Sequence, residues 1–196
     1  VMKMEQEQLI VKKLEQIRKS GIDKKIKQKI YNIISDEEFN DMMVRTKTEE
    51  SAIKKLQLRK YKKAEELRDL IGIMITTNTE EEAYKITKRI ILENSDCKIE
   101  DYIKHPKNGY KSIHLNYSLK TSEINDIPLE IQIKTENMRI AQELVHDKIY
   151  KNINLPPNVR DFLSTIMFKY IEYKQSLGEN MSNDNKYIYK LNEYIK

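Results

Sequence analysis

The sequence is poor in the residues that build disulfides, metal clusters and membrane spans. Cys97 is the only cysteine among 196 residues, and there are three histidines. An internal disulfide is therefore excluded, as is a zinc site built on a cysteine cluster. No apolar run approaches the roughly 18 residues that cross a bilayer, and the first residues are charged where a secretory signal is apolar. We therefore expect a cytoplasmic protein with no membrane partner.

The remaining composition is that of a globular protein. Hydrophobic residues make up 39% of the chain and charged residues 34%. This balance leaves enough apolar surface for a core and gives most helices one solvated face. The length suits one domain, with or without a helical appendage.

Positive charge is concentrated in one window. The whole chain carries a net charge of +5, and residues 45–68 alone hold nine basic and four acidic residues. Such a concentration attracts phosphate, whether on a nucleotide or on RNA. A solvated helix face in a lysine-rich sequence produces the same pattern, so that charge alone leaves both interpretations open.

The first third of the chain has helical periodicity. Apolar residues at spacings of three and four predict two helices within residues 9–34. Ser35 and Glu38 match a capping box, which predicts a third helical stretch through Met42. The segment up to about Lys63 is therefore expected to contain only helices and loops.

The period changes after this segment. Residues 70–77 form a β-branched, uncharged run that is typical of a strand covered on both faces. Thr79 and Glu82 match a second capping box and predict a helix. Strict alternation of apolar and polar residues then predicts two strands, 113–119 and 129–133, which should pair as a hairpin.

Helices are expected again at the carboxyl end. Residues 136–150 have an amphipathic pattern, and residues 159–171 form an unusually complete apolar stripe. This stripe either closes the core or joins a neighbouring subunit, and the sequence leaves both open. A short final helix is expected over residues 187–194. The overall expectation is an α+β fold, with a mixed sheet flanked by helices and with helical N- and C-terminal extensions.

Two carboxylates are candidates for chemistry. Asp69 lies where the basic segment becomes the first predicted strand, so that its carboxylate is expected beside the lysines as a metal ligand. Glu130 lies on the polar face of its strand and is expected to face His114 and Ser112 across the hairpin. An ordinary turn aspartate and a solvent-facing glutamate fit the same positions, and position alone favours those interpretations.

The loop over residues 105–112 is more informative. It combines an Asn-Gly turn with an aromatic ring and two lysines. Tyr110 is suited to stack on a purine, and Lys107 to contact phosphate oxygens.

The same residues carry a resemblance to a known family. The chain resembles the synthetase domain of RelA/SpoT-type proteins, and especially the small alarmone synthetases that lack a hydrolase domain. The similarity covers roughly residues 40 to 151 and implies a nucleotidyltransferase-like core over residues 45–151, between a helical segment 1–44 and C-terminal helices 152–196. Four ordered blocks carry it: residues 45–55, 69–73, 101–114 and 130–151.

The resemblance implies an enzyme that transfers the β,γ-pyrophosphate of ATP to the ribose 3′-hydroxyl of GDP or GTP, with Mg²⁺ as cofactor and AMP as leaving group. Most of the acceleration should then come from alignment and charge neutralisation. The implied roles are ATP binding by Arg45, Lys47, Ser51 and Lys55; acceptor binding by Lys107, Asn108, Tyr110, His114 and Gln132; and catalysis and metal binding by Asp69 and Glu130.

Three positions depart from the family pattern. Met74 stands where the metal strand usually has an arginine, which removes a cation. The acceptor loop is one residue shorter, so the register of Lys107 differs. Lys134 replaces an arginine, which keeps the charge but loses the bidentate fork. These departures bear on donor affinity and acceptor choice.

Two other functions compete with (p)ppGpp synthesis. Some small relatives are toxins that pyrophosphorylate the 3′ end of tRNA, and the altered loop and the basic 54–63 segment are compatible with that acceptor. A non-catalytic RNA- or nucleotide-binding module is the third hypothesis. The resemblance also implies a tetramer assembled through terminal helices. The sequence does not determine which guanine nucleotide is the acceptor, whether a nucleotide regulates the protein, or whether an antitoxin partner exists.

Overall fold

The structure is a computed structural model that describes residues 2–58, 66–119, 127–150 and 154–181. The chain divides into two compact units. Unit 1 comprises residues 1–100 and 113–133, and unit 2 comprises residues 101–112 and 134–196.

A five-stranded sheet organises unit 1, with only the last residue of β3 and the last two of β5 assigned to unit 2. Its strand order is β1-β2-β5-β4-β3, and the pairs β1/β2 and β4/β5 are antiparallel. The expected α+β fold, with a mixed sheet flanked by helices, is confirmed. The strands are β1 (Asp41–Thr46), β2 (Ile71–Thr77), β3 (Lys98–Asp101), β4 (Ile113–Leu119) and β5 (Ile127–Thr135).

The hairpin expected from alternation is present as β4 and β5. In β5 the apolar residues Leu129, Ile131 and Ile133 are fully buried, whereas Glu130 and Gln132 between them are half-buried on the opposite face. The apolar face forms core because each buried branched side chain removes apolar surface from water. The opposite face keeps its polar side chains available for chemistry.

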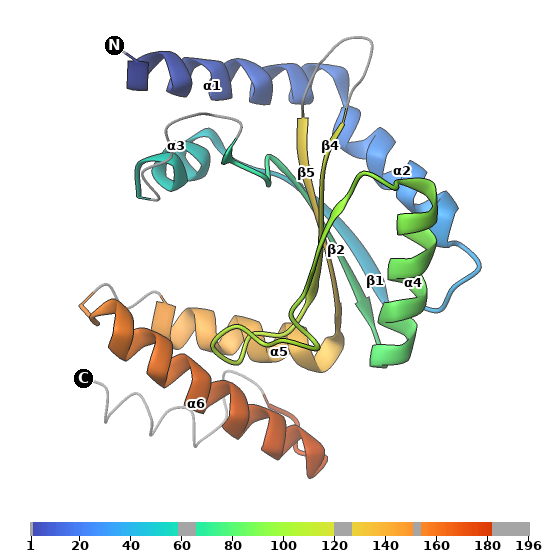
Figure 1. The fold of residues 1–196 in the computed structure, drawn as a ribbon, viewed down its shortest axis with the longest axis vertical. Coiled ribbons are helices and arrows are strands. Elements are labelled where there is room, and N and C mark those ends of the chain that lie inside the picture. The colour runs from blue at the N-terminus through green and yellow to red at the C-terminus, as the bar shows by residue number, and fades with distance from the viewer. Residues whose placement is uncertain (1, 59–65, 120–126, 151–153, 182–196) are drawn as a thin grey trace. The chain divides into compact units, whose positions relative to one another are not determined.

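Helices cover the apolar face of the sheet. In Figure 1, α2 (Ile22–Ile34) and α4 (Glu80–Glu93) lie on the same side of the strands. The Thr46 hydroxyl donates to Asp23 Oδ2 at 3.0 Å, which links β1 to α2. At the start of α4 both hydrogen bonds of the expected capping box between Thr79 and Glu82 are formed. Two further helices, α1 (Met2–Ser20) and α3 (Glu49–Leu58), pack against each other in this unit.

The helix expected through Met42 is wrong. Ser35 ends α2 as its C-cap instead of starting a helix, and residues 41–46 form β1. The register of β1 on β2 places Met42 opposite Ile75, and Met42 is buried. A local capping pattern contributes about 1 kcal/mol, whereas pairing with β2 satisfies a whole row of backbone groups and buries apolar side chains. The segment before Lys63 therefore contains a strand, and the short strand β3 was also not expected.

Unit 2 is helical around its own core. It contains α5 (Glu136–Val145), a π-helical turn, η2 (His146–Tyr150), and α6 (Pro157–Ser176). The apolar stripe of α6 divides: Met167 and Ile171 are buried in the core, whereas Phe162 and Ile166 are 65% and 45% exposed. The helix therefore closes the core and also leaves an apolar strip on the surface. The expected helix at 187–194 lies outside the described residues, and the proposed boundaries at residues 44 and 151 stay a prediction.

Among the residues that the structure describes, no helix combines the length and the apolar character that crossing a membrane requires.

Replacing Gly109 by alanine should destabilise unit 2 more than the same change at Gly178. Both glycines have positive φ, +84° and +78°, where an L side chain costs about 1 kcal/mol. A Cβ at Gly109 would also lie 2.6 Å from Phe168 Cβ, whereas a Cβ at Gly178 meets nothing within 4 Å. We expect an additional loss of about 1–3 kcal/mol in G109A, measured by urea unfolding. Equal losses in the two variants would contradict the close approach of the loop to α6.

Candidate active site

The centre of the candidate site is the carboxylate of Asp69, which lies two residues before β2. Lys47 Nζ donates to Asp69 Oδ2 at 2.8 Å, and Lys55 Nζ donates to the same oxygen at 2.9 Å. Lys47 follows β1 directly, where its backbone N–H bonds to the Leu70 carbonyl at 2.8 Å, and Lys55 comes from α3. Two separate segments of the basic window therefore converge on one carboxylate.

The two oxygens of Asp69 differ in their surroundings. Oδ2 accepts both lysine hydrogen bonds, whereas Oδ1 is buried and has no hydrogen-bond partner among the described residues. Burial raises the pKa of Asp69, but the hydrogen bonds and charges of Lys47 and Lys55 outweigh it and hold the pKa below its ordinary value. The carboxylate is therefore ionised at neutral pH and has one buried oxygen to offer to a cation or a donor.

Glu130 lies on the polar face of β5 in contact with both strands of the hairpin. Gln132 Nε2 donates to Glu130 Oε1 at 2.7 Å, and His114 Nδ1 lies 3.6 Å from Glu130 Oε2. The register explains the contact with His114: it sits opposite Gln132, two residues along from Glu130, so the pair is diagonal across the hairpin. The expected approach of Glu130 to His114 is confirmed.

The surroundings of Glu130 also define its charge. Burial raises the pKa of Glu130. The charge of His114 and the hydrogen bonds of His114 and Gln132 lower it by more, so the pKa lies below its ordinary value. The negative charge of Asp69 opposes ionisation and is the smallest of these influences. Asp69 directly precedes the approach to β2, and Glu130 lies in the neighbouring strand β5, so both carboxylates belong to adjacent strand segments of unit 1.

The other donor-site candidates are less enclosed. Arg45 lies in β1 opposite Gly72, and its side chain is exposed. Ser51 is half-buried in the first turn of α3, where its backbone N–H bonds to Thr48 Oγ1 at 3.2 Å. Met74 lies two residues beyond Gly72 on β2 and therefore on the same face as Arg45. Because Met74 stands where the family usually has an arginine, β2 contributes no positive charge at this position, next to Arg45 of β1.

Asn116 and Glu100 extend the polar face toward β3. Asn116 is 7% exposed, and its Nδ2 donates to Glu100 Oε2 at 3.3 Å, while its Oδ1 is buried without a partner within the described ranges. The alternation of residues 113–119 already placed Asn116 on the face of His114. Glu100 was missed because it belongs to β3, whose four residues have no clear period.

The acceptor-loop candidates belong to unit 2. Lys107 and Tyr110 exchange backbone hydrogen bonds of 3.1 and 2.9 Å, which closes a tight turn around Asn108 and Gly109. Asn108 has φ of 51° and Gly109 has φ of 84°, the pair of positive values that an Asn-Gly turn requires. Lys107 is exposed at the start of the turn, and Tyr110 is half-buried at its end.

The donor atoms present suit Mg²⁺ better than a transition metal. Within the described ranges, no group of three or more His, Cys, Asp or Glu side chains could hold a metal by itself. Mg²⁺ is commonly held by one or two carboxylates together with waters and substrate phosphates. The partnerless Oδ1 of Asp69, near the Glu130 carboxylate, fits that requirement.

Comparisons with known structures identify the fold. Small alarmone synthetase 1 from Bacillus subtilis aligns with a TM-score of 0.63 and 22% identity, over 84% of this chain and 91% of that one. Small alarmone synthetase 2 from Bacillus subtilis aligns at 0.59 with 27% identity, over 83% and 91%. The Type VI effector Tas1, solved with its immunity protein, aligns at 0.57 with 12% identity, over 79% and 92%. Synthetase 1 has also been crystallised with its product pppGpp and with AMPCPP.

The comparison by sequence gives the family. No curated protein sequence matches the chain. The family model described as "Region found in RelA / SpoT proteins" matches residues 44–154, more than half of the chain, and this range contains all of the site residues inferred from the sequence. The chain therefore belongs to the family defined by the region found in RelA and SpoT proteins.

Proposed function

We propose that the chain is a GTP/GDP pyrophosphokinase, which transfers the β,γ-pyrophosphate of ATP to the ribose 3′-hydroxyl of GDP or GTP. Unit 1 supplies the ATP and metal residues, and the 105–112 loop of unit 2 supplies the guanine platform. Since ATP and guanine nucleotides are cytoplasmic metabolites, the proposal keeps the cytoplasmic location expected from the sequence.

One observation carries the proposal: the ionised Asp69 carboxylate, which accepts hydrogen bonds from both Lys47 and Lys55. Transfer of pyrophosphate is mainly a problem of positioning and of neutralising charge on phosphate oxygens. Lys47 and Lys55, with the exposed Arg45, supply the positive charge for the ATP phosphates. Asp69 aligns the lysines in advance, so that little reorganisation is needed when ATP binds.

Asp69 Oδ1 and the Glu130 carboxylate are the groups that would hold Mg²⁺. When bound, Mg²⁺ neutralises phosphate charge and polarises the attacked phosphorus centre. The two lysines neutralise Asp69 only at Oδ2. Asp69 Oδ1 therefore remains available to bind Mg²⁺.

Glu130 is proposed to orient the attacking hydroxyl. Its lowered pKa keeps it ionised at neutral pH, so its carboxylate accepts a hydrogen bond from the ribose 3′-hydroxyl. A carboxylate of low pKa is a weak base, and general-base catalysis is most efficient when the pKa is near the working pH. We therefore assign Glu130 mainly to alignment of the hydroxyl. The hydroxyl proton passes to the Glu130 carboxylate as the new oxygen–phosphorus bond forms and the bond to the leaving AMP breaks. His114 and Gln132 fix the orientation of the Glu130 carboxylate.

The 105–112 loop is proposed to hold the acceptor. Tyr110 offers a ring on which guanine can stack, and Lys107 offers an exposed charge at the start of the same turn. Asn108 is half-buried in the turn, and its side-chain amide is a further candidate for contact with the base or its phosphates.

A tRNA 3′ end is the second candidate acceptor. Lys104 and Lys107 are both exposed beside the turn, and exposed lysines next to an aromatic ring also suit single-stranded RNA. The similarity in fold to the effector Tas1 is compatible with a toxic member of the family. A non-catalytic nucleotide-binding module is the third candidate, and it would not need Asp69 or Glu130.

Asp69→Asn and Glu130→Gln should each lower the rate of pyrophosphate transfer by at least about 100-fold, because each removes a carboxylate charge that would hold Mg²⁺ at the reacting phosphates. Asp96→Asn and Glu93→Gln are matched controls, since both side chains are exposed and outside the site. The measurement is formation of AMP from labelled ATP in the presence of GDP. Unchanged rates in both site variants would exclude catalysis at this cluster. No AMP formation by the wild-type chain would instead favour the non-catalytic module.

Incubation with ATP labelled in its β and γ phosphates, and with either GDP, GTP or deacylated tRNA, should transfer label to GDP or GTP. A purine ring stacked on Tyr110 should make this transfer sensitive to Tyr110→Ala, with a loss of about 10-fold or more in kcat/KM for the acceptor. If only tRNA became labelled, the acceptor would be the tRNA 3′ end and not GDP or GTP.

We also propose that a second copy of the chain covers the exposed strip on α6, as part of a tetramer. Phe162, Ile166 and Tyr173 are 65%, 45% and 60% exposed and recur at spacings of four and seven residues. Such spacing is typical of a helix that pairs with another helix. The oligomer is independent of the chemistry in unit 1.

Phe162→Asp should lower the molecular mass in solution, measured by light scattering at several protein concentrations, because a charge in the strip must be desolvated on association. Leu92→Asp is the control, since Leu92 is 70% exposed on α4 in unit 1. An unchanged mass in the Phe162 variant would show that α6 does not form the contact.

A further inference from the structure

Lys134 is a charged residue in an unusual place. Its side chain is 0% exposed near the end of β5, between the buried residues Ile133 and Thr135. Burial of an ammonium group is costly unless hydrogen-bond acceptors replace the lost water. A methionine fills a similar volume without that cost, so packing alone does not explain a lysine here.

The contacts of Lys134 lead to the acceptor loop. Its Nζ donates to the Tyr110 hydroxyl at 3.3 Å and also to Gln142 Oε1 from α5. The Nζ lies 5.3 Å from the centre of the Tyr110 ring, farther than from the hydroxyl, so the ammonium is at the hydroxyl end of the side chain. Because an ammonium has donors only, the Tyr110 oxygen must accept this hydrogen bond.

The rest of the Tyr110 ring is held by aromatic neighbours. The ring of Phe168, from α6, lies 6.5 Å away at an interplanar angle of 64°, and the ring of Tyr102 lies 6.0 Å away at 55°. Two aromatic rings limit the tilt of the Tyr110 ring, and Lys134 contacts its hydroxyl end. The hydrogen bond from Lys134 holds that end, while Gln142 holds the ammonium.

We propose that Lys134 is a positioning residue, which fixes the Tyr110 ring and thereby sets the affinity for the guanine acceptor. This inference rests on the proposed function, in which Tyr110 is the guanine platform. Lys134 is fully buried and acts on the nucleotide only through Tyr110. A stacking ring that is already fixed loses less freedom when a base binds, so preorganisation appears as affinity.

The test compares binding of GDP and of ATP to the full chain by calorimetry, with no turnover. Lys134→Met should raise the Kd for GDP about tenfold, which is the loss of one hydrogen bond to a charged group. The Kd for ATP should stay within about twofold, because the ATP residues belong to unit 1. Lys134→Arg should recover most of the GDP affinity, since a guanidinium can donate the same hydrogen bond. Lys88→Met is the control for a lysine exposed on α4.

A double-mutant cycle isolates the contact itself. Tyr110→Phe removes only the oxygen that accepts the hydrogen bond, so the effect of Lys134→Met should shrink to less than about twofold in the Tyr110→Phe background. Additive effects, an unchanged Kd for GDP in Lys134→Met, or equal weakening of GDP and ATP would each overturn the positioning role. Thermal melting shows whether Lys134→Met folds. If it does not, Tyr110→Phe alone becomes the test and should raise the Kd for GDP about tenfold, because it removes the same hydrogen bond. An unchanged Kd for GDP in Tyr110→Phe would then overturn the inference.

Failure of this inference and failure of the proposed function are distinguishable. A wild-type chain that binds GDP with the expected dependence on Lys134, yet transfers no pyrophosphate, refutes the transfer reaction and supports the positioning role. A wild-type chain that transfers pyrophosphate, with GDP binding unaffected by Lys134→Met, refutes the positioning role alone.

Discussion

The ion pair of Asp69 with Lys47 and Lys55 is the interaction on which the candidate site depends. It joins the end of β1, the helix α3 and the approach to β2 through one carboxylate oxygen. Two like charges are held together there because the carboxylate lies between them, and the carboxylate stays ionised despite burial for the same reason. A purely structural ion pair would satisfy both oxygens. The buried Oδ1, without a partner in the described part of the chain, indicates that stability was not the only requirement.

One face of the sheet forms the hydrophobic core, and the other face carries polar residues of the candidate site. Branched apolar residues of β2 and β5 form the core against α2 and α4, and this core keeps the strands in register. The register in turn holds His114 and Gln132 at Glu130 on the other face. Both acidic groups are thus placed by strands that the hydrophobic core fixes, and a rigid scaffold is what charge preorganisation requires.

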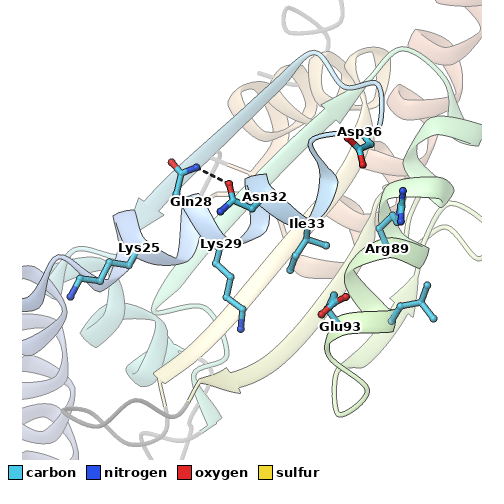
Figure 2. A pocket seen from close by; sticks show the side chains of 9 residues that line it. Lys25, Gln28, Lys29, Asn32, Ile33, Asp36, Arg89 and Glu93 are labelled. Carbon is cyan, nitrogen blue, oxygen red and sulfur yellow. Dashed lines mark hydrogen bonds between the residues drawn. The ribbon is translucent and has the colours of Figure 1, made fainter.

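An open groove of unit 1 lies away from this chemistry. Figure 2 shows it between α2 and α4, with Lys25, Lys29 and Arg89 among its lining residues. Its volume is about 750 Å³, but its cations are surface side chains, accompanied by Asp36 and Glu93. Size alone is therefore a poor guide to function here. The chemistry of a site follows from paired and partly unsatisfied groups.

Local patterns in the sequence were sufficient for the β4/β5 hairpin, the α4 capping box and the Asn-Gly turn, because neighbouring residues decide alternation, capping and turn geometry. They failed for β1, since pairing with β2 overrode a capping pattern at Ser35. The sequence placed Asp69 beside the lysines of the basic segment, but it did not predict that Lys55 bonds Asp69 or that Lys134 bonds Tyr110, pairs separated by 14 and 24 residues. The sequence was sufficient to predict the residues of the site, but only the tertiary structure determined which of these side chains contact one another. The physical reason is that side-chain contacts between distant segments depend on strand order and packing, which no local period encodes.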